Sequence, residues 1–224
     1  MVCLAWLVLG TIARYCYARE LRVRLQPTGG VPVSERGRPD GLRVLLLGDS
    51  RMAFWPDLPT NQFLTINAGV AGETTSQILL RLPAVLSNSH PGVVILQAGI
   101  NDLKALGVFP EQGSAIQSRC LENLSEMVRA SRQSGAKVVL VLVIQPGGIG
   151  WTRRLVWSDQ IPEAVRQVNL ALRQKFEHFE GVKVLDPALL LGVGRVEEDY
   201  RDELHLTPTA YKKLEAGLLP MLPP

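Results

Sequence analysis

Five short apolar runs recur along the chain, and they constrain the fold more than any other feature. They span residues 43–48 (RVLLLG), 63–69 (FLTINAG), 93–99 (VVILQAG), 137–144 (KVVLVLVI) and 182–186 (VKVLD). Each run is almost continuously apolar rather than alternating, which is typical of strands that are covered on both faces. Segments with helical spacing of apolar residues separate the runs, at 74–87, 111–133 and 162–179. A last helix is expected after Thr207, a plausible N-cap, with Pro208 at its first position.

This alternation of strand and helix predicts an α/β fold, because right-handed crossovers place parallel strands in one sheet between helices. In such folds ligands bind outside the carboxyl ends of the strands. The residues that directly follow each apolar run are therefore the candidates for a functional site.

The N-terminal part of the chain differs from the rest. Residues 1–24 are a hydrophobic segment whose uncharged run, 2–13, is short for a membrane span unless it extends to residue 17. A membrane anchor or uncleaved signal, a cleaved signal peptide and a packed helix all remain open, and so does a cytoplasmic or exported location. Residues 25–41, rich in Pro, Gly and charge, are expected to be a linker, and 42–224 the folded domain.

The charge balance and the few Cys and His residues exclude several functions. The 24 basic and 21 acidic residues are spread along the chain, so nothing favours a nucleic-acid partner. Three cysteines and three histidines offer neither a disulfide framework nor a zinc pattern. We therefore expect no metal and no cofactor.

Five polar or glycine positions stand at or near the expected strand ends and before the last helix: Ser50, Gly72, Asn101, Asp202 and His205. Each of these residues, taken alone, is common in turns or helix caps. Together they supply what acyl transfer requires. His205 could take the proton of Ser50, and Asp202, three residues earlier, could fix the imidazole tautomer. The backbone N–H groups of Ser50 and Gly72 and the amide of Asn101 could stabilise an oxyanion.

The blocks LLLGDS, NAGVAGETT, QAGIND and DELHLTPTAY resemble, in this order and spacing, those of the SGNH hydrolase superfamily, the GDSL-type esterases and lipases. The resemblance covers residues 43 to about 219. It implies a three-layer α/β/α sandwich with a five-stranded parallel sheet of flavodoxin-like topology. It also implies the catalytic and oxyanion-hole roles just derived, with a small acyl ester as substrate. The second and fourth blocks are most similar to platelet-activating-factor acetylhydrolase-like and carbohydrate acetylesterase-like members.

The expected function is therefore a serine esterase acting on acyl esters, with short acetyl-type esters favoured. A lysophospholipase or thioesterase acting on longer chains, and a catalytically silent binding module of the same fold, remain alternatives. A nucleotide-binding or phosphate-binding domain would need a glycine-rich loop after the first strand, and GDSRMAF has one glycine. The oligomeric state is left open.

The sequence also offers four candidate substrate contacts. Arg51 replaces the leucine of the Gly-Asp-Ser-Leu string and is either a solvated arginine or a holder of a phosphate or carboxylate group. Trp151, Arg153 and Arg154 lie in a segment that would overhang the site, where they could bind a sugar or an anionic headgroup. A packed surface loop explains these three residues equally well.

Overall fold

The sheet at the centre of the molecule confirms the α/β prediction. The computed structural model describes residues 8–12, 15–16, 33–59, 61–149, 157–191 and 196–223. Within these residues the sheet has six strands: β1 (Ser34–Gly37), β2 (Leu42–Gly48), β3 (Phe63–Gly69), β4 (Val93–Gln97), β5 (Lys137–Val141) and β6 (Val182–Leu185). Their spatial order is β1-β3-β2-β4-β5-β6. Strands β2 to β6 pair in parallel, and they are the five predicted strands.

The expected count of five strands was wrong by one. Strand β1 pairs antiparallel with β3, from Ser34 opposite Asn67 to Gly37 opposite Leu64. Its four residues are all exposed and only one strand borders it, so it carries no hydrophobic signal. Backbone pairing alone defines this edge strand. It lies within the range expected to be a linker, and the division into 1–24, 25–41 and 42–224 stays a prediction.

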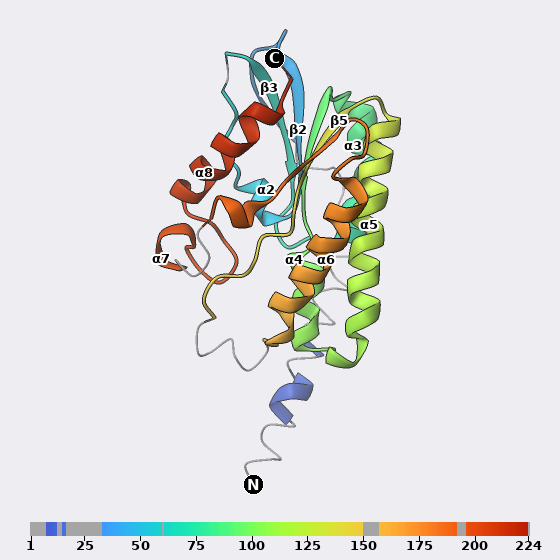
Figure 1. The fold of residues 1–224 in the computed structure, drawn as a ribbon, viewed down its shortest axis with the longest axis vertical. Coiled ribbons are helices and arrows are strands. Elements are labelled where there is room, and N and C mark those ends of the chain that lie inside the picture. Colours follow the sequence, from blue (N-terminus) through green and yellow to red (C-terminus); the bar gives the residue numbers. More distant parts are fainter. Residues whose placement is uncertain are drawn as a thin grey trace.

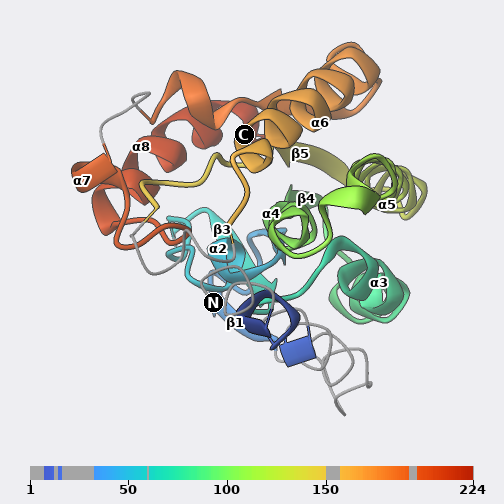
Figure 2. The ribbon, with the colours of Figure 1, turned by 90° about the horizontal axis from the view of Figure 1, so that it is seen from below.

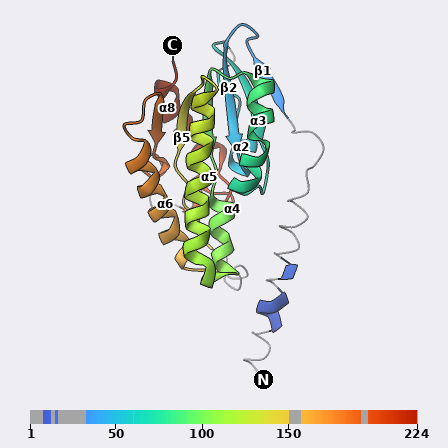
Figure 3. The ribbon, with the colours of Figure 1, turned by 90° about the vertical axis from the view of Figure 1, so that its right-hand side faces the viewer.

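Helices cover both faces of the sheet in three layers (Figures 1 and 3). Helices α3 (Thr75–Ser89), α5 (Gly113–Gln133) and α6 (Gln160–Phe176) pack on one face, and α8 (Pro208–Leu218) packs on the other. In β2, Leu45 and Leu47 belong to the first core and Val44 and Leu46 to the second. Burial on both sides explains why the strand sequences are continuously apolar.

Short elements lie at the carboxyl end of the sheet, which Figure 2 views from below. Helix α2 (Ser50–Ala53) follows β2 with one residue between them, and α4 (Ile100–Leu103) follows β4 closely. Elsewhere in the described residues lie the short helix α7 (Val196–Asp199) and the 3-10 turns Lys104–Gly107, Pro110–Gln112, Pro187–Leu189 and Leu219–Met221. Strand β2 lies between β3 and β4, at the switch point of the sheet where α/β proteins bind ligands.

The predicted cap of the last helix is confirmed, and near the N-terminus the structure describes only a few residues. Thr207 caps α8 as predicted, because its Oγ1 accepts a hydrogen bond of 3.2 Å from the Ala210 N–H and Pro208 opens the helix. At the N-terminus the described residues 8–12 and 15–16 are helical and exposed. Among the described residues, none of the helices combines the length and the apolar character that a membrane crossing requires.

Candidate active site

The serine of the first block stands at the beginning of helix α2. Asp49 is the N-cap of this helix, and its Oδ1 accepts a hydrogen bond of 3.0 Å from the Arg51 N–H. Burial raises the pKa of the Asp49 carboxyl, while the nearby Arg51 acts to lower it. Ser50 is 8% exposed. Asp49 therefore fixes the turn that presents Ser50 at the end of β2.

Close packing of α2 on the sheet depends on the glycine that ends β3. Gly69 pairs with Gly48 in the parallel ladder. A Cβ at Gly69 would lie 2.2 Å from the backbone N of Ala53. The Asn67 side chain accepts from the Gly69 N–H at 2.9 Å and donates to the Met52 carbonyl at 3.0 Å. The end of β3 thus holds the helix that carries Ser50.

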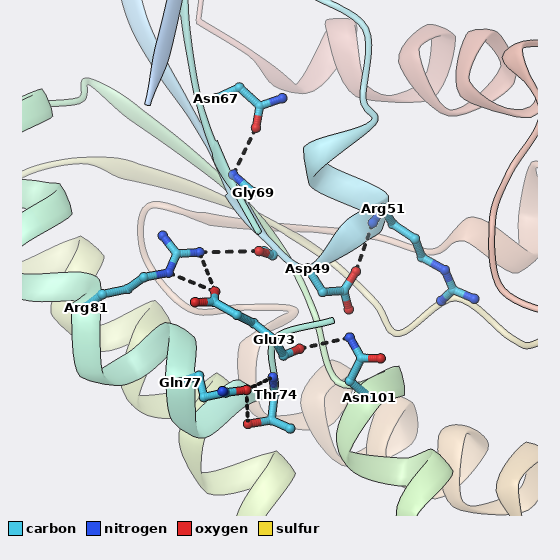
Figure 4. Close-up of polar contacts among 10 residues, drawn as sticks. Asp49, Arg51, Asn67, Gly69, Glu73, Thr74, Gln77, Arg81 and Asn101 are labelled. Carbon is cyan, nitrogen blue, oxygen red and sulfur yellow. Dashed lines mark hydrogen bonds and ion pairs between the residues drawn. The ribbon is translucent and has the colours of Figure 1, made fainter. Parts of the chain in front are cut away.

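The glycine block forms a loop that contacts the nucleophile strand, through a hydrogen bond of 3.0 Å from the Val70 N–H to the Gly48 carbonyl, and that also contacts Asn101. Figure 4 shows the contact with Asn101. Gly72 has a φ of +81°, a conformation that favours glycine. The next residue, Glu73, accepts a hydrogen bond of 2.9 Å at its backbone carbonyl from the Asn101 Nδ2 amide. Asn101 comes from α4, so the structure brings the second and third blocks together beside Gly72.

An ion pair between Arg81 of α3 and Glu73 stabilises the same loop. Arg81 pairs with the Glu73 carboxylate at 2.8 Å and reaches the Gly48 carbonyl at 3.4 Å (Figure 4). Burial raises the pKa of Glu73, and the hydrogen bond from Arg81 opposes this shift. The sequence analysis did not identify this pair, because its two residues carry no role in acyl transfer.

Asp102, next to Asn101, anchors α4 to the start of α3. Its carboxylate accepts from the Thr75 N–H at 2.9 Å and from the Thr75 hydroxyl at 2.6 Å. Asn123 of α5 donates to the Thr75 and Ser76 hydroxyls at 3.0 and 2.9 Å. Burial raises the pKa of Asp102 to about 6, although the bonds from Thr75 act against it. This polar network fixes the orientation of the helix that carries Asn101.

Asp202 and His205 form the predicted pair. His205 Nδ1 lies 2.7 Å from Asp202 Oδ2, and Asp202 Oδ1 accepts from the N–H groups of Leu204 and His205 at 2.8 and 2.9 Å. Burial alone would raise the pKa of Asp202, but the hydrogen bonds from the His205 ring and the two amides lower it to about 2. An ionised carboxylate only accepts, so Nδ1 carries the proton and Nε2 of the neutral ring is the acceptor.

Two contacts join this pair to the nucleophile helix. The ring of Phe54, four residues after Ser50, packs edge-on against the His205 ring, with 5.5 Å between the centroids. Arg51, the residue after Ser50, donates from Nε to the Leu204 carbonyl at 2.9 Å. These contacts bring the segment that carries His205 to the turn that carries Ser50.

Arg51 corrects one prediction. It was expected to be solvated or to hold an anionic group of the substrate, but its side chain is completely buried. Its guanidinium donates to three backbone carbonyls, those of Ile144, Gln145 and Leu204. These bonds repay the burial of the charge and leave Arg51 out of reach of a substrate.

The other candidate substrate contacts, Trp151, Arg153 and Arg154, lie outside the described residues. Of the three cysteines, Cys16 is exposed and Cys120 is buried, and both are free thiols. In the described part of the chain, no cluster of three or more His, Cys, Asp or Glu side chains is placed to hold a metal ion.

A three-layer sandwich with a serine at the switch point, and with an Asp–His pair on a segment tied to the turn that carries this serine, is an arrangement compatible with ester hydrolysis. The sequence model of the GDSL-like lipase/acylhydrolase family matches residues 37–213. The chain belongs to this family and is a carboxylic ester hydrolase.

Individual relatives agree with this family. The chain is 31% identical over 152 residues to an arylesterase of Vibrio mimicus, covering 61% of this chain and 72% of the relative. It is 29% identical over 163 residues to the esterase TesA of Pseudomonas aeruginosa, covering 72% and 71%. A thioesterase 1/protease 1/lysophospholipase L1 of Escherichia coli is 27% identical over 141 residues, covering 58% and 64%.

Solved structures share the fold at lower identity. A GDSL-like lipase from Bacteroides thetaiotaomicron superposes with a TM-score of 0.67 at 20% identity, covering 92% of this chain and 96% of the other. An acetylxylan esterase from Geobacillus stearothermophilus gives a TM-score of 0.61 at 16% identity, covering 80% and 93%.

Proposed function

We propose that this esterase hydrolyses acyl esters through an acyl-serine intermediate, with Ser50 as nucleophile and His205 and Asp202 as the other members of the triad. The observation that carries the proposal is the 2.7 Å contact between His205 Nδ1 and Asp202 Oδ2, on a segment that Arg51 ties to the nucleophile turn. No second acid is needed, because His205 acts first as base and then as acid.

In the first step the Ser50 Oγ attacks the ester carbonyl carbon while His205 Nε2 takes the hydroxyl proton. The tetrahedral intermediate collapses when the same proton passes to the alkoxy leaving group, which departs as an alcohol. Water then attacks the acyl-serine, with His205 again accepting a proton and returning it to Ser50 Oγ. The ionised Asp202 holds the imidazole in the required tautomer and stabilises the imidazolium that forms.

Charge on the carbonyl oxygen needs donors that are already in position. We assign this role to the backbone N–H groups of Ser50 and Gly72 and to the Asn101 side chain. The bond from Asn101 to the Glu73 carbonyl supports the assignment, because it holds the Asn101 amide against the residue that follows Gly72. Loss of one such donor typically costs about 10²–10³-fold in kcat.

For the acyl group we propose a short chain, such as acetyl. A cavity of about 350 Å³ adjoins Asn101, and Thr74, Ser76 and Gln112 are among the residues that line it. This small volume suits a short acyl group better than a long alkyl chain. The fold shared with an acetylxylan esterase is compatible with this choice.

A second candidate is hydrolysis of long acyl chains. A larger apolar cavity, of about 580 Å³, lies between α6 and the segment after β5 and is lined by Leu142, Ile144, Leu170 and Leu191 among others. A series of p-nitrophenyl esters from acetate to decanoate separates the two. We expect kcat/KM to be highest for acetate or butyrate, and a steady rise with chain length would replace the first proposal by the second.

The catalytic role of Ser50 is tested by labelling the wild-type protein with a fluorophosphonate probe and locating the adduct by mass spectrometry. We expect a single adduct on Ser50 and none in Ser50→Ala, which should also lose hydrolysis of p-nitrophenyl acetate while keeping its circular dichroism spectrum. Absence of the Ser50 adduct under native conditions would favour a silent binding module, and undiminished turnover by Ser50→Ala would refute the assignment.

A further inference from the structure

Arg51, the residue after Ser50, forms long-range hydrogen bonds that the leucine of the Gly-Asp-Ser-Leu string could not form. The guanidinium of Arg51 donates to the Leu204 carbonyl at 2.9 Å, to the Ile144 carbonyl at 2.6 Å and to the Gln145 carbonyl at 3.3 Å. These partners are 153, 93 and 94 residues away in the sequence. One buried side chain thus joins three separate stretches of the chain.

The segment after β5 and the segment before His205 are also joined directly. The Gly147 N–H donates to the Glu203 carbonyl at 2.9 Å, and the Tyr200 hydroxyl donates to the Gln145 carbonyl at 2.9 Å. Residues 144–147 and 200–205 therefore form one bonded unit, which we call the histidine support. Arg51 links the histidine support to the nucleophile helix α2.

The backbone of Arg51 is itself fixed on both sides. Its N–H donates to Asp49 Oδ1 at 3.0 Å, and its carbonyl accepts from the Tyr211 hydroxyl of α8 at 2.9 Å. The guanidinium therefore extends from a rigid point, and Figure 4 shows it directed away from Glu73 and Asn101. A leucine at this position has no donor and would leave the three carbonyls without the bonds that Arg51 supplies.

We propose that Arg51 is a positioning residue that holds the histidine support, and with it His205, in the position relative to Ser50 that catalysis requires. This inference rests on the proposed triad. A planar guanidinium has several donors at fixed angles, so it can orient three carbonyls at once, whereas the lysine ammonium is a compact point charge on a flexible chain. Catalysis depends on this relative position, since a misplacement of about 1 Å can cost about 10²-fold in rate.

A purely structural role is the alternative, and a matched control distinguishes it. Arg132 of α5 also joins separate backbone segments, donating to the Ala136 carbonyl at 2.6 Å and to the Glu180 carbonyl at 3.1 Å. These partners lie near the amino ends of β5 and β6, at the opposite end of the sheet from Ser50. Arg132→Leu should therefore lower stability without changing catalysis.

The experiment compares Arg51→Leu, Arg51→Lys and Arg132→Leu with the wild type. For each protein, kcat and KM for p-nitrophenyl acetate, the rate of fluorophosphonate labelling of Ser50 and the urea unfolding midpoint are measured. We expect kcat and the labelling rate to fall about 10²-fold in Arg51→Leu and about 10-fold in Arg51→Lys. KM should change less than about threefold, because only the position of His205 relative to Ser50 is disturbed. The His205 Nδ1–H proton resonance should broaden or disappear in Arg51→Leu and persist in Arg132→Leu.

A kcat within about threefold of wild type in folded Arg51→Leu would overturn the proposal. If Arg51→Leu does not fold, the same criterion is applied to Arg51→Lys. If neither variant folds while Arg132→Leu does, the role of Arg51 is structural and the proposal is rejected. Labelling of Ser50 in the wild type tests the triad separately, so a failure of the proposed function is distinguishable from a failure of this inference.

Discussion

The contact between Gly69 and helix α2 provides a direct test of how the fold positions the nucleophile. In Gly69→Ala the new Cβ would lie 2.2 Å from the Ala53 N, 2.6 Å from the Met52 carbonyl carbon and 2.7 Å from the Ala53 Cα. Non-bonded carbon atoms need about 3.5 Å, so α2 must move away from β3 by about 1 Å. The contacting atoms are backbone, and no side-chain rotation can relieve the overlap.

We expect this displacement to reduce kcat/KM for p-nitrophenyl acetate about 10²-fold, because it moves Ser50 relative to the groups that activate it. Overpacking should also destabilise the protein by about 1–3 kcal/mol in urea unfolding. Gly113→Ala is the matched control. There the Cβ meets a single neighbour within 4 Å, the Leu106 Cδ2 atom at 3.2 Å, at the end of a flexible side chain.

The control should keep full activity, and its stability should be unchanged or slightly higher, because Ala is the better helix former. A Gly69→Ala protein with kcat/KM within about threefold of wild type would show that the end of β3 does not set the position of Ser50, which would refute the reasoning.

Three further predictions concern single residues of the site. Asp202→Asn removes the acceptor that fixes the His205 tautomer, so kcat should fall about 10³–10⁴-fold, and a loss below about tenfold would contradict this role. Phe54 is 52% exposed beside His205, the residue proposed to protonate the leaving group, so Phe54→Ala should raise KM for phenyl acetate about 3–10-fold and leave KM for methyl acetate nearly unchanged. Equal changes for both esters would remove Phe54 from the leaving-group site. Because burial raises the pKa of Asp102 from 3.8 to about 6, the stabilisation from its protonation is complete below about pH 3.8 and is lost as the pH rises through 6. Relative to Asp102→Asn, the unfolding free energy of the wild type should therefore fall by about 3 kcal/mol between about pH 3 and about pH 7.5, and a difference independent of pH would contradict the shift.

The parallel strands could be predicted from the sequence because burial on both faces leaves a continuous apolar run. The ends of the runs were less predictable. The run 93–99 was expected to be one strand, but β4 ends at Gln97, because Gly99 has a φ of +118° and is the N-cap of α4. Strand β1 could not be found, since Ser34–Gly37 is exposed and only its backbone partner defines it.

The site divides in the same way between local and long-range information. Asp202 and His205 could be paired in advance because they are three residues apart, and their mutual orientation follows from one turn of backbone. Arg51 was misjudged because a charged residue after a strand is usually solvated, and nothing nearby in the sequence indicates otherwise. Its burial depends on carbonyls at Ile144 and Leu204, which only the folded chain brings to it. The sequence motifs therefore predict the candidate reacting groups. The hydrogen bonds of the Arg51 side chain, which no motif indicates, join the segment that carries His205 to the turn that presents Ser50.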